Sequence, residues 1–185
     1  MWLKLSLPLV CVFFVLSLAA PKPEETYYVW KYDFEWFSCF SYATTDKSRV
    51  NYRTSSRRNC LSMLAMDSAP CPGPKNVTGE SVSVKPTPKE GVERPYGHEL
   101  YNCSDVTCPE GFKCRGLHYF GGSTCCNMKY KKLSDEGHSE KCPDGSDAPK
   151  VDEYTQIAHD CKNLKCGDGQ KCVVVNEYFA KCCKA

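Results

Sequence analysis

The cysteines are the residues of this sequence with the most evident chemistry, because 15 of its 185 residues are cysteine. A thiol can ligate a metal ion, act as a nucleophile or pair as a disulfide. Secretion into an oxidising compartment favours disulfides, particularly when the number of cysteines is even. The location that the N-terminus predicts therefore decides which chemistry we expect.

The first twenty residues predict secretion. Lys4 precedes an apolar run from Leu5 to Leu18, and Ser17 and Ala19 provide the small residues of a signal-peptidase site. We predict a signal peptide of residues 1–19, a secreted, extracellular protein, and no membrane association after cleavage. Cys11 leaves with the signal peptide, and fourteen cysteines remain, which is an even number. We therefore expect seven disulfides, no metal site and no free thiol; the paired residues are Cys39, Cys60, Cys71, Cys103, Cys108, Cys114, Cys125, Cys126, Cys142, Cys161, Cys166, Cys172, Cys182 and Cys183.

Two sequons are consistent with this route through the cell. Asn76 begins Asn-Val-Thr and Asn102 begins Asn-Cys-Ser, so we predict glycosylation at both. Asn76 is the better acceptor, because its surroundings have the composition of a loop. Asn102 stands beside a cysteine whose pairing would compete with glycan addition.

Other catalytic chemistry has no support in the sequence. The four histidines lack a zinc-protease spacing, and the sequence contains neither a Gly-x-Ser-x-Gly motif nor a phosphate-binding loop. We therefore expect no catalytic residues and no cofactor. A net charge of +2 gives no argument for nucleic-acid binding. The histidines are His98, His118, His138 and His159.

An internal repeat explains how the cysteines are organised. One copy reads Cys103-x4-Cys108-x5-Cys114-x10-Cys125-Cys126, and the other reads Cys161-x4-Cys166-x5-Cys172-x9-Cys182-Cys183. Each copy follows a Cys-Pro pair, Cys71-Pro72 or Cys142-Pro143, so each has six cysteines. Cys39 and Cys60 are left to pair with each other. Of the fifteen connectivities that six cysteines allow, twelve leave the adjacent cysteines unbonded to each other, and the sequence does not choose among them.

The repeat also predicts local structure. The β-branched run from Lys171 to Val175 favours a strand, Asn176-Glu177 a turn, and Tyr178 to Cys183 the returning strand. In the first copy, Gly121-Gly122 is the expected turn. Adjacent cysteines in a strand point to opposite faces, so each should reach a different partner.

The segment before the repeats is aromatic and basic. Residues 27–45 are rich in Tyr, Trp and Phe, which predicts either a buried β-hairpin or an exposed aromatic platform for a ligand. Ser55 is a candidate cap for a helix that ends before Pro70. The basic stretch from Lys47 to Arg58 is either a solvated face or a binding surface for an anionic partner.

These elements predict a small disulfide-rich fold in which an aromatic N-terminal β/α unit precedes two β-hairpin cysteine-rich repeats. Each repeat is too small for a sufficient apolar core, so disulfides should replace it. The expected boundaries are 20–70 for the N-terminal unit, 71–126 for the first repeat with a proline-rich loop at 76–100, 127–141 for a polar linker, and 142–185 for the second repeat.

The repeat resembles the lustrin-type cysteine-rich repeat of secreted invertebrate proteins, notably those of nematodes. Cys142-Pro-Asp-Gly145 through Cys183 carries this resemblance best, whereas the first copy has Cys71-Pro-Gly-Pro74 and a long insertion before Cys103. Asp33, Cys39 and Cys60 also have the spacing of the second half of a Kunitz inhibitor, without the segment that carries the inhibitory loop.

The resemblance implies an extracellular structural or interaction role. We therefore expect a binding or matrix protein that is not an enzyme, and whose partner is another extracellular protein or the matrix. The alternative is an extracellular protease inhibitor, in which a basic loop such as 127–140 enters an active site. Stoichiometric inhibition of a trypsin-like enzyme would distinguish the two functions.

Overall fold

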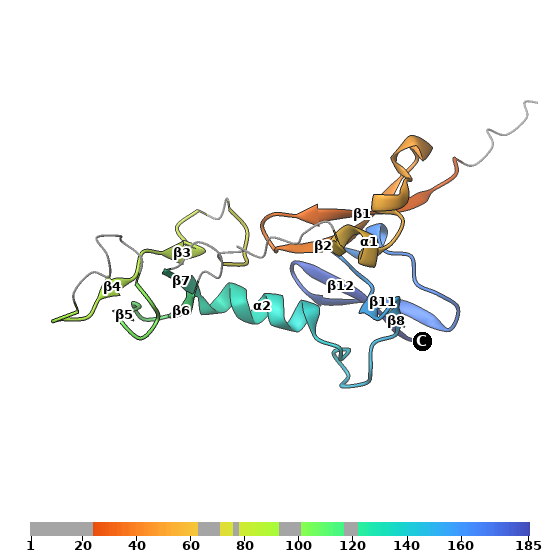
Figure 1. The fold of residues 1–185 in the computed structure, drawn as a ribbon. Coiled ribbons are helices and arrows are strands. Elements are labelled where there is room, and N and C mark those ends of the chain that lie inside the picture. The colour runs from red at the N-terminus through yellow and green to blue at the C-terminus, as the bar shows by residue number, and fades with distance from the viewer. Residues whose placement is uncertain (1–23, 63–70, 76–77, 93–100, 117–121) are drawn as a thin grey trace, which may run out of the picture.

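The computed structural model describes residues 24–62, 71–75, 78–92, 101–116 and 122–185. The predicted signal peptide and Asn76, His98, His118 and Gly121 lie outside the described residues. Figure 1 shows two groups of small antiparallel sheets joined by one long helix, α2, with strands β3 to β7 at one end and β1, β2 and β8 to β12 at the other.

The aromatic segment forms a hairpin. Strand β1 (Tyr27–Asp33) pairs antiparallel with β2 (Ser38–Thr44), in a register that runs from Tyr27↔Thr44 to Asp33↔Ser38. The short helices η1 (Lys47–Arg49), η2 (Tyr52–Thr54) and α1 (Arg57–Ser62) follow. Ser56, rather than the predicted Ser55, accepts a hydrogen bond from a backbone N–H of α1, that of Asn59. The predicted continuation of this helix beyond Ser62 lies outside the described residues.

The proline-rich loop predicted at 76–100 contains paired strands in its described part. Strand β3 (Ser83–Val84) pairs with β7 (Ser123–Asn127), which also pairs with β6 (Phe112–Gly116), so the sheet order is β3-β7-β6. Strand β4 (Thr87–Pro88) pairs with β5 (Val106–Thr107). Strand pairing therefore orders part of this loop, because Val84 and Thr87 are β-branched and pair with residues of β7 and β5.

Most of the segment predicted as a polar linker, 127–141, forms helix α2 (Met128–His138). The Asn127 side chain accepts a hydrogen bond from the Lys129 N–H and caps the first turn. The buried residues are Tyr130, Ser134 and Gly137, which share one helical face. That face contains one aromatic residue and two small ones, so the segment has the composition of a connector and the packing of a core helix.

The C-terminal segment contains the hairpin that its sequence predicts. Strand β11 (Gln170–Asn176) pairs antiparallel with β12 (Phe179–Lys184), and β10 (Ile157–Ala158) adds to the other edge of β12. Before them lie the small hairpin β8 (Lys150–Val151) and β9 (Tyr154–Thr155); the short helix η4 (Cys161–Asn163) lies between β10 and β11.

Seven disulfides join all fourteen described cysteines. Cys39 pairs with Cys60. The six cysteines from Cys71 to Cys126 pair first with sixth, second with fourth and third with fifth, and the six from Cys142 to Cys183 have the same connectivity. We call these two sets unit 1 and unit 2. In both units the adjacent cysteines reach different partners, as their place in a strand predicts.

The core joins segments that the sequence assigns to separate units. Trp36 and Phe40 from the aromatic segment pack with Tyr130 of α2 and with Ile157 and Phe179 of unit 2. The N-terminal hairpin, α2 and unit 2 therefore share one core rather than standing as independent units. The aromatic segment contributes mainly to this core, although Phe34 at its turn is 66% exposed.

Candidate functional site

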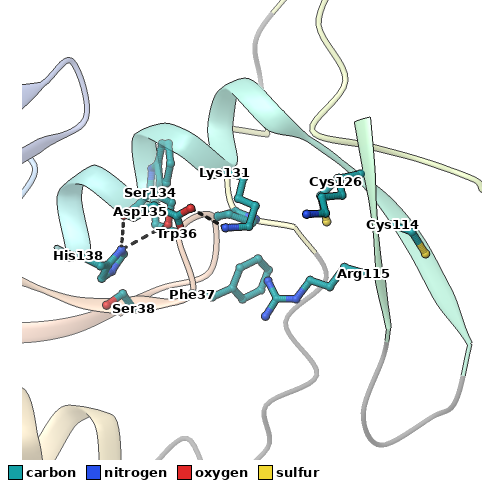
Figure 2. Close-up of a pocket in the computed structure, with 12 residues that line it drawn as sticks. Trp36, Phe37, Ser38, Cys114, Arg115, Cys126, Lys131, Ser134, Asp135 and His138 are labelled. Carbon is teal, nitrogen blue, oxygen red and sulfur yellow. Dashed lines mark hydrogen bonds and ion pairs between the residues drawn. The ribbon is translucent and has the colours of Figure 1, made fainter. Parts of the chain in front are cut away.

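A cleft of about 480 Å³ lies where the two groups of sheets meet. Its walls come from the β1–β2 turn, strand β6 and helix α2, and Figure 2 shows their side chains converging on it. The described lining residues are Trp36, Phe37, Ser38, Pro72, Lys113, Cys114, Arg115, Cys126, Lys131, Ser134, Asp135 and His138.

Strand pairing explains which side chains of unit 1 reach the cleft. Lys113 pairs with Cys126, so the two side chains project from the same face of the hairpin, and Arg115 two residues later projects with them. Cys114 projects from the opposite face, where it is bonded to Cys103. The Cys71–Cys126 disulfide ties the cleft face to Pro72.

The β1–β2 turn forms a second wall. The Asp33 carboxylate accepts hydrogen bonds from the backbone N–H groups of Glu35 and Trp36 at 2.7 and 3.1 Å. The Gly73 N–H donates to the Glu35 carbonyl at 2.8 Å, which joins the turn to the start of unit 1. Phe37 has a φ of 49°, a left-handed conformation that is uncommon for an aromatic residue. Figure 2 shows its ring beside the Arg115 side chain.

Helix α2 supplies the third wall. Lys131 forms an ion pair with Asp135 one turn later on the exposed side of the helix. His138 Nδ1 lies 2.8 Å from the Ser134 carbonyl oxygen, to which it donates. Neither Lys113 nor Arg115 makes an ion pair with another described residue. The cleft therefore presents two unneutralised cations, whereas the cation on the helix has its own carboxylate.

Two basic side chains, Arg57 and Lys181, lie behind this wall, and neither forms an ion pair with a described carboxylate. Arg57 is 6% exposed and donates to the Thr155 carbonyl at 2.6 Å and to Ser38 Oγ at 3.1 Å. Its Nε has no partner among the described residues. Burial lowers the pKa of Arg57 to about 10.

Lys181 closes the end of α2. Its side chain is 0% exposed, and Nζ donates to the carbonyls of Glu136, Ser139 and Lys141 at 3.1, 2.8 and 3.0 Å. Carbonyls at a helix C-terminus lack intrahelical partners. The buried Lys181 ammonium therefore provides hydrogen-bond donors for these carbonyls, and they provide acceptors for the ammonium. Burial, with a further contribution from the positive charge of Arg57, lowers the pKa of Lys181 to about 8.

The two described histidines lie in different electrostatic surroundings. Burial, with further contributions from the positive charges of Arg57 and Lys181, lowers the pKa of His138 to about 4. His159 is also partly buried, which lowers its pKa, but the hydrogen bonds that its ring donates to the Asp33 carboxylate and the Tyr178 carbonyl outweigh that effect and raise it. His159 Nε2 lies 2.9 Å from the Asp33 carboxylate, and its ring stacks on Phe40 with a centroid distance of 4.1 Å.

The predicted site residues are distributed over the whole fold rather than gathered at the cleft. Asn102 is exposed, and its backbone N–H donates to the Asp105 carboxylate. In the basic stretch, Arg57 is a core residue while Lys47, Arg49, Arg53 and Arg58 are exposed. The predicted inhibitory loop at 127–140 is largely helical, and a helix does not fit a protease active site as an extended loop does.

The cleft itself was not predicted from the sequence. Its walls come from residues between Trp36 and His138, which only the tertiary fold brings together. One signal was present, because Lys113 and Arg115 alternate around Cys114 in a segment whose counterpart reads as a strand. Alternation in a strand places both cations on one face.

Comparisons with family models, with curated proteins and with solved structures find no match to this chain. Among the described residues, no helix has the length and apolar character needed to cross a membrane. Nor do three or more His, Cys, Asp or Glu side chains in the described ranges gather closely enough to hold a metal ion.

Proposed function

We propose that the protein is a secreted, extracellular binding protein without catalytic activity, and that the cleft between β6, α2 and the β1–β2 turn is its binding site. The observation that carries the proposal is the pair of unneutralised cations, Lys113 and Arg115, beside the ring of Phe37 in an open cavity of about 480 Å³. Pockets of this size with a few convergent polar groups are typical ligand sites.

The frame around the cleft supports this proposal. Cys71–Cys126 and Cys103–Cys114 attach both faces of β6 and its partner strand to neighbouring segments. Side chains that are held in place before binding lose less conformational entropy when a ligand arrives. The two disulfides therefore fix, before a ligand binds, the backbone from which Lys113 and Arg115 project.

We further propose that units 1 and 2 are two copies of one repeat of the lustrin type, preceded by an aromatic N-terminal unit. Their identical order of disulfide pairing supports duplication, together with the spacing of their last five cysteines, which differs by one residue. Seven disulfides are consistent with an extracellular protein. A cleaved signal peptide and glycans at Asn76 and Asn102 belong to the same proposal, and intact mass of the secreted protein before and after deglycosylation tests them.

A matched pair of substitutions on the β1–β2 turn tests the binding site. Phe37→Gly removes a ring from the cleft and keeps a residue that readily adopts the positive φ of this position. Phe34→Gly removes the exposed ring from the same turn, outside the cleft lining. A random displayed peptide library is selected on the immobilised protein, and the selected peptides are then titrated against both variants.

We expect the selected peptides to bind Phe37→Gly at least about tenfold more weakly than the wild type, and Phe34→Gly nearly as well as the wild type. Equal affinities for the two variants, or a library that yields no binder, would contradict the proposed site. The inhibitor alternative makes a separate prediction, which is stoichiometric loss of trypsin or chymotrypsin activity when the protein is added.

A further inference from the structure

We infer that the cleft takes an extended acidic segment of a partner polypeptide, which pairs with the free edge of β6 and places alternate carboxylates beside Lys113 and Arg115. This inference rests on the proposed function, because it assigns a ligand class to the same cleft. Three observations carry it: the charge of the cleft, the spacing of its cations and the position of β6 in its sheet.

Charge selects an anionic partner. Lys113 and Arg115 make no ion pair among the described residues, and the carboxylate nearest to them in the lining, Asp135, is engaged by Lys131. An acidic ligand would therefore meet two free cations without displacing an existing ion pair. An Arg guanidinium also suits carboxylates in particular, because it donates two parallel hydrogen bonds.

Spacing selects an extended polypeptide. Lys113 and Arg115 are two residues apart on one strand, which places their attachment points about 6.6–6.8 Å apart on the same face. Alternate side chains of an extended peptide have the same separation. Acidic residues at two alternate positions of such a peptide would each lie opposite one of the two cations.

The hydrogen-bonding pattern shows which backbone groups of β6 face outward. The Asn127 N–H donates to Val82, on the β3 side, whereas the Met128 N–H donates to Gly111, on the β6 side. Because successive residues of a strand direct their N–H and C=O groups to opposite sides, Cys126 and Thr124 face β6. Their partners, Lys113 and Arg115, therefore face β7, and Cys114 between them points its N–H and C=O away from β7.

The sheet leaves that outward edge open. Among the described strands the order is β3-β7-β6, so β6 has one neighbour and a free side. A peptide strand added there would pair with the backbone of Cys114, and its side chains opposite Lys113 and Arg115 would lie about 4.5–5.5 Å from theirs between Cβ atoms. Cys114 itself lines the cleft, so this edge and the charged face open into one cavity.

The experiment uses a fluorescein-labelled peptide, Gly-Glu-Thr-Glu-Thr-Glu-Thr-Gly, titrated with the full secreted protein and followed by fluorescence anisotropy. The cleft variant is Lys113→Gln/Arg115→Gln. The matched control, Lys165→Gln/Lys171→Gln, removes the same charge from exposed positions of unit 2 that do not line the cleft. Intact mass and circular dichroism establish that both variants keep seven disulfides and the wild-type fold.

We expect the cleft variant to bind the peptide about tenfold or more weakly, and the control to change by less than about twofold. A peptide with Gln in place of Glu should lose affinity to a similar extent. N-methylation of both Thr residues that lie between Glu residues should also weaken binding, because it removes the donors that would reach the free edge of β6.

Three results would overturn the inference. Equal losses in the cleft variant and the control would indicate general charge attraction rather than a site. Binding of a sulfated heparin hexasaccharide without binding of the acidic peptide would assign the cleft to a polysaccharide. Library-selected ligands that are sensitive to Phe37→Gly and insensitive to Lys113→Gln/Arg115→Gln would leave the proposed binding site standing and remove the acidic ligand. Library-selected ligands that bind both Phe37→Gly and Lys113→Gln/Arg115→Gln as well as the wild type would contradict the proposed function as well.

Discussion

Units 1 and 2 have the same disulfide connectivity and the same central hairpin, yet they use one equivalent face in opposite ways. In unit 1, the face that carries Cys126 also carries Lys113 and Arg115 and opens into the cleft. In unit 2, the equivalent face is covered around Val173, which packs there against Cys142, Ala148 and Cys183, while Lys171 on the same face stays exposed.

The cover in unit 2 comes from the C-terminal end of α2 and from the segment after it, which includes Cys142 and Ala148. Lys181 lies opposite Val173 in the pairing and donates to three carbonyls at that helix end. Its counterpart in the pairing of unit 1 is Thr124, opposite Arg115. The comparison indicates that the disulfides determine the hairpin, while the residue after the fourth cysteine and its cross-strand partner determine whether the face joins the core or stays open for a ligand.

The largest expected effect comes from removing, in each unit, the disulfide between its second and fourth cysteines. Cys103–Cys114 and Cys161–Cys172 each span 11 residues, so chain entropy alone assigns them equal stabilisation. Because unit 2 shares its core with β1–β2 and α2, we expect Cys161→Ala/Cys172→Ala to lower the global free energy of unfolding by about 3 kcal/mol. Hydrogen exchange should then increase across the whole shared core.

The corresponding change in unit 1, Cys103→Ala/Cys114→Ala, should increase exchange in β5, β6 and β7 and leave β1–β2 protected. Chemical denaturation and hydrogen exchange of both variants measure the difference. An identical decrease in the global free energy of unfolding in both variants would show that the two units are equally coupled to the core, and would contradict the contrast between them.

Acid should weaken the joint between α2 and unit 2. The pKa of His138 is about 4 in the fold against an ordinary value of 6.5, so the folded protein resists taking up this proton. Its contribution to stability is complete above pH 6.5 and is lost as the pH falls toward 4, by about 3 kcal/mol. The raised pKa of His159 acts in the opposite direction, because its contribution is present at low pH and declines as the pH rises through its folded pKa.

Replacing His138 with Gln tests this account, since glutamine does not titrate. The free energy of unfolding of His138→Gln should vary less between pH 6.5 and 4 than that of the wild type, measured by urea denaturation at several pH values. The control His159→Gln should make the acid-induced loss larger. A wild-type pH dependence in His138→Gln would mean that another group controls acid stability.

Packing at α2 gives a smaller effect. A Cβ on Gly137 would lie 2.2 Å from ring atoms of Phe179, so Gly137→Ala should force the helix away from unit 2 at a cost of about 1–2 kcal/mol. In unit 1, a Cβ on Gly116 would meet nothing closer than a backbone oxygen at 4.0 Å. Thermal denaturation of Gly116→Ala should therefore give a midpoint close to the wild type, and an equal shift in both variants would contradict the assigned packing.

Exchanging the residue after the fourth cysteine gives the smallest change in stability. Val173→Arg should cost about 1 kcal/mol, because it removes an apolar contact from a covered face. Arg115→Val should leave stability within about 0.5 kcal/mol, because Arg115 is exposed, and should weaken binding of the acidic peptide. Urea denaturation and peptide titration of both variants test the assignment, which fails if Arg115→Val is the more destabilised.

Local patterns predicted the hairpin of unit 2 and the disulfide cysteines, because β-branched runs and cysteine spacing are encoded in consecutive residues. They did not predict α2, whose buried face consists of Tyr130, Ser134 and Gly137 and has no apolar periodicity. Nor did they predict the shared core, since the contacts of Phe40 with Phe179 and of Arg57 with Thr155 join residues about a hundred or more positions apart. The cleft depends on the same long-range contacts.

The most direct test of the central claim is a map of amide chemical shifts in the isotopically labelled protein as the acidic peptide is added. The account predicts changes along β6, centred on Lys113, Cys114 and Arg115, with further changes at Lys131 and Phe37. Strand β11 of unit 2 should be unaffected around Lys171. Changes of equal size on β11, or changes confined to the basic stretch from Lys47 to Arg58, would contradict the assignment of the cleft as the binding site.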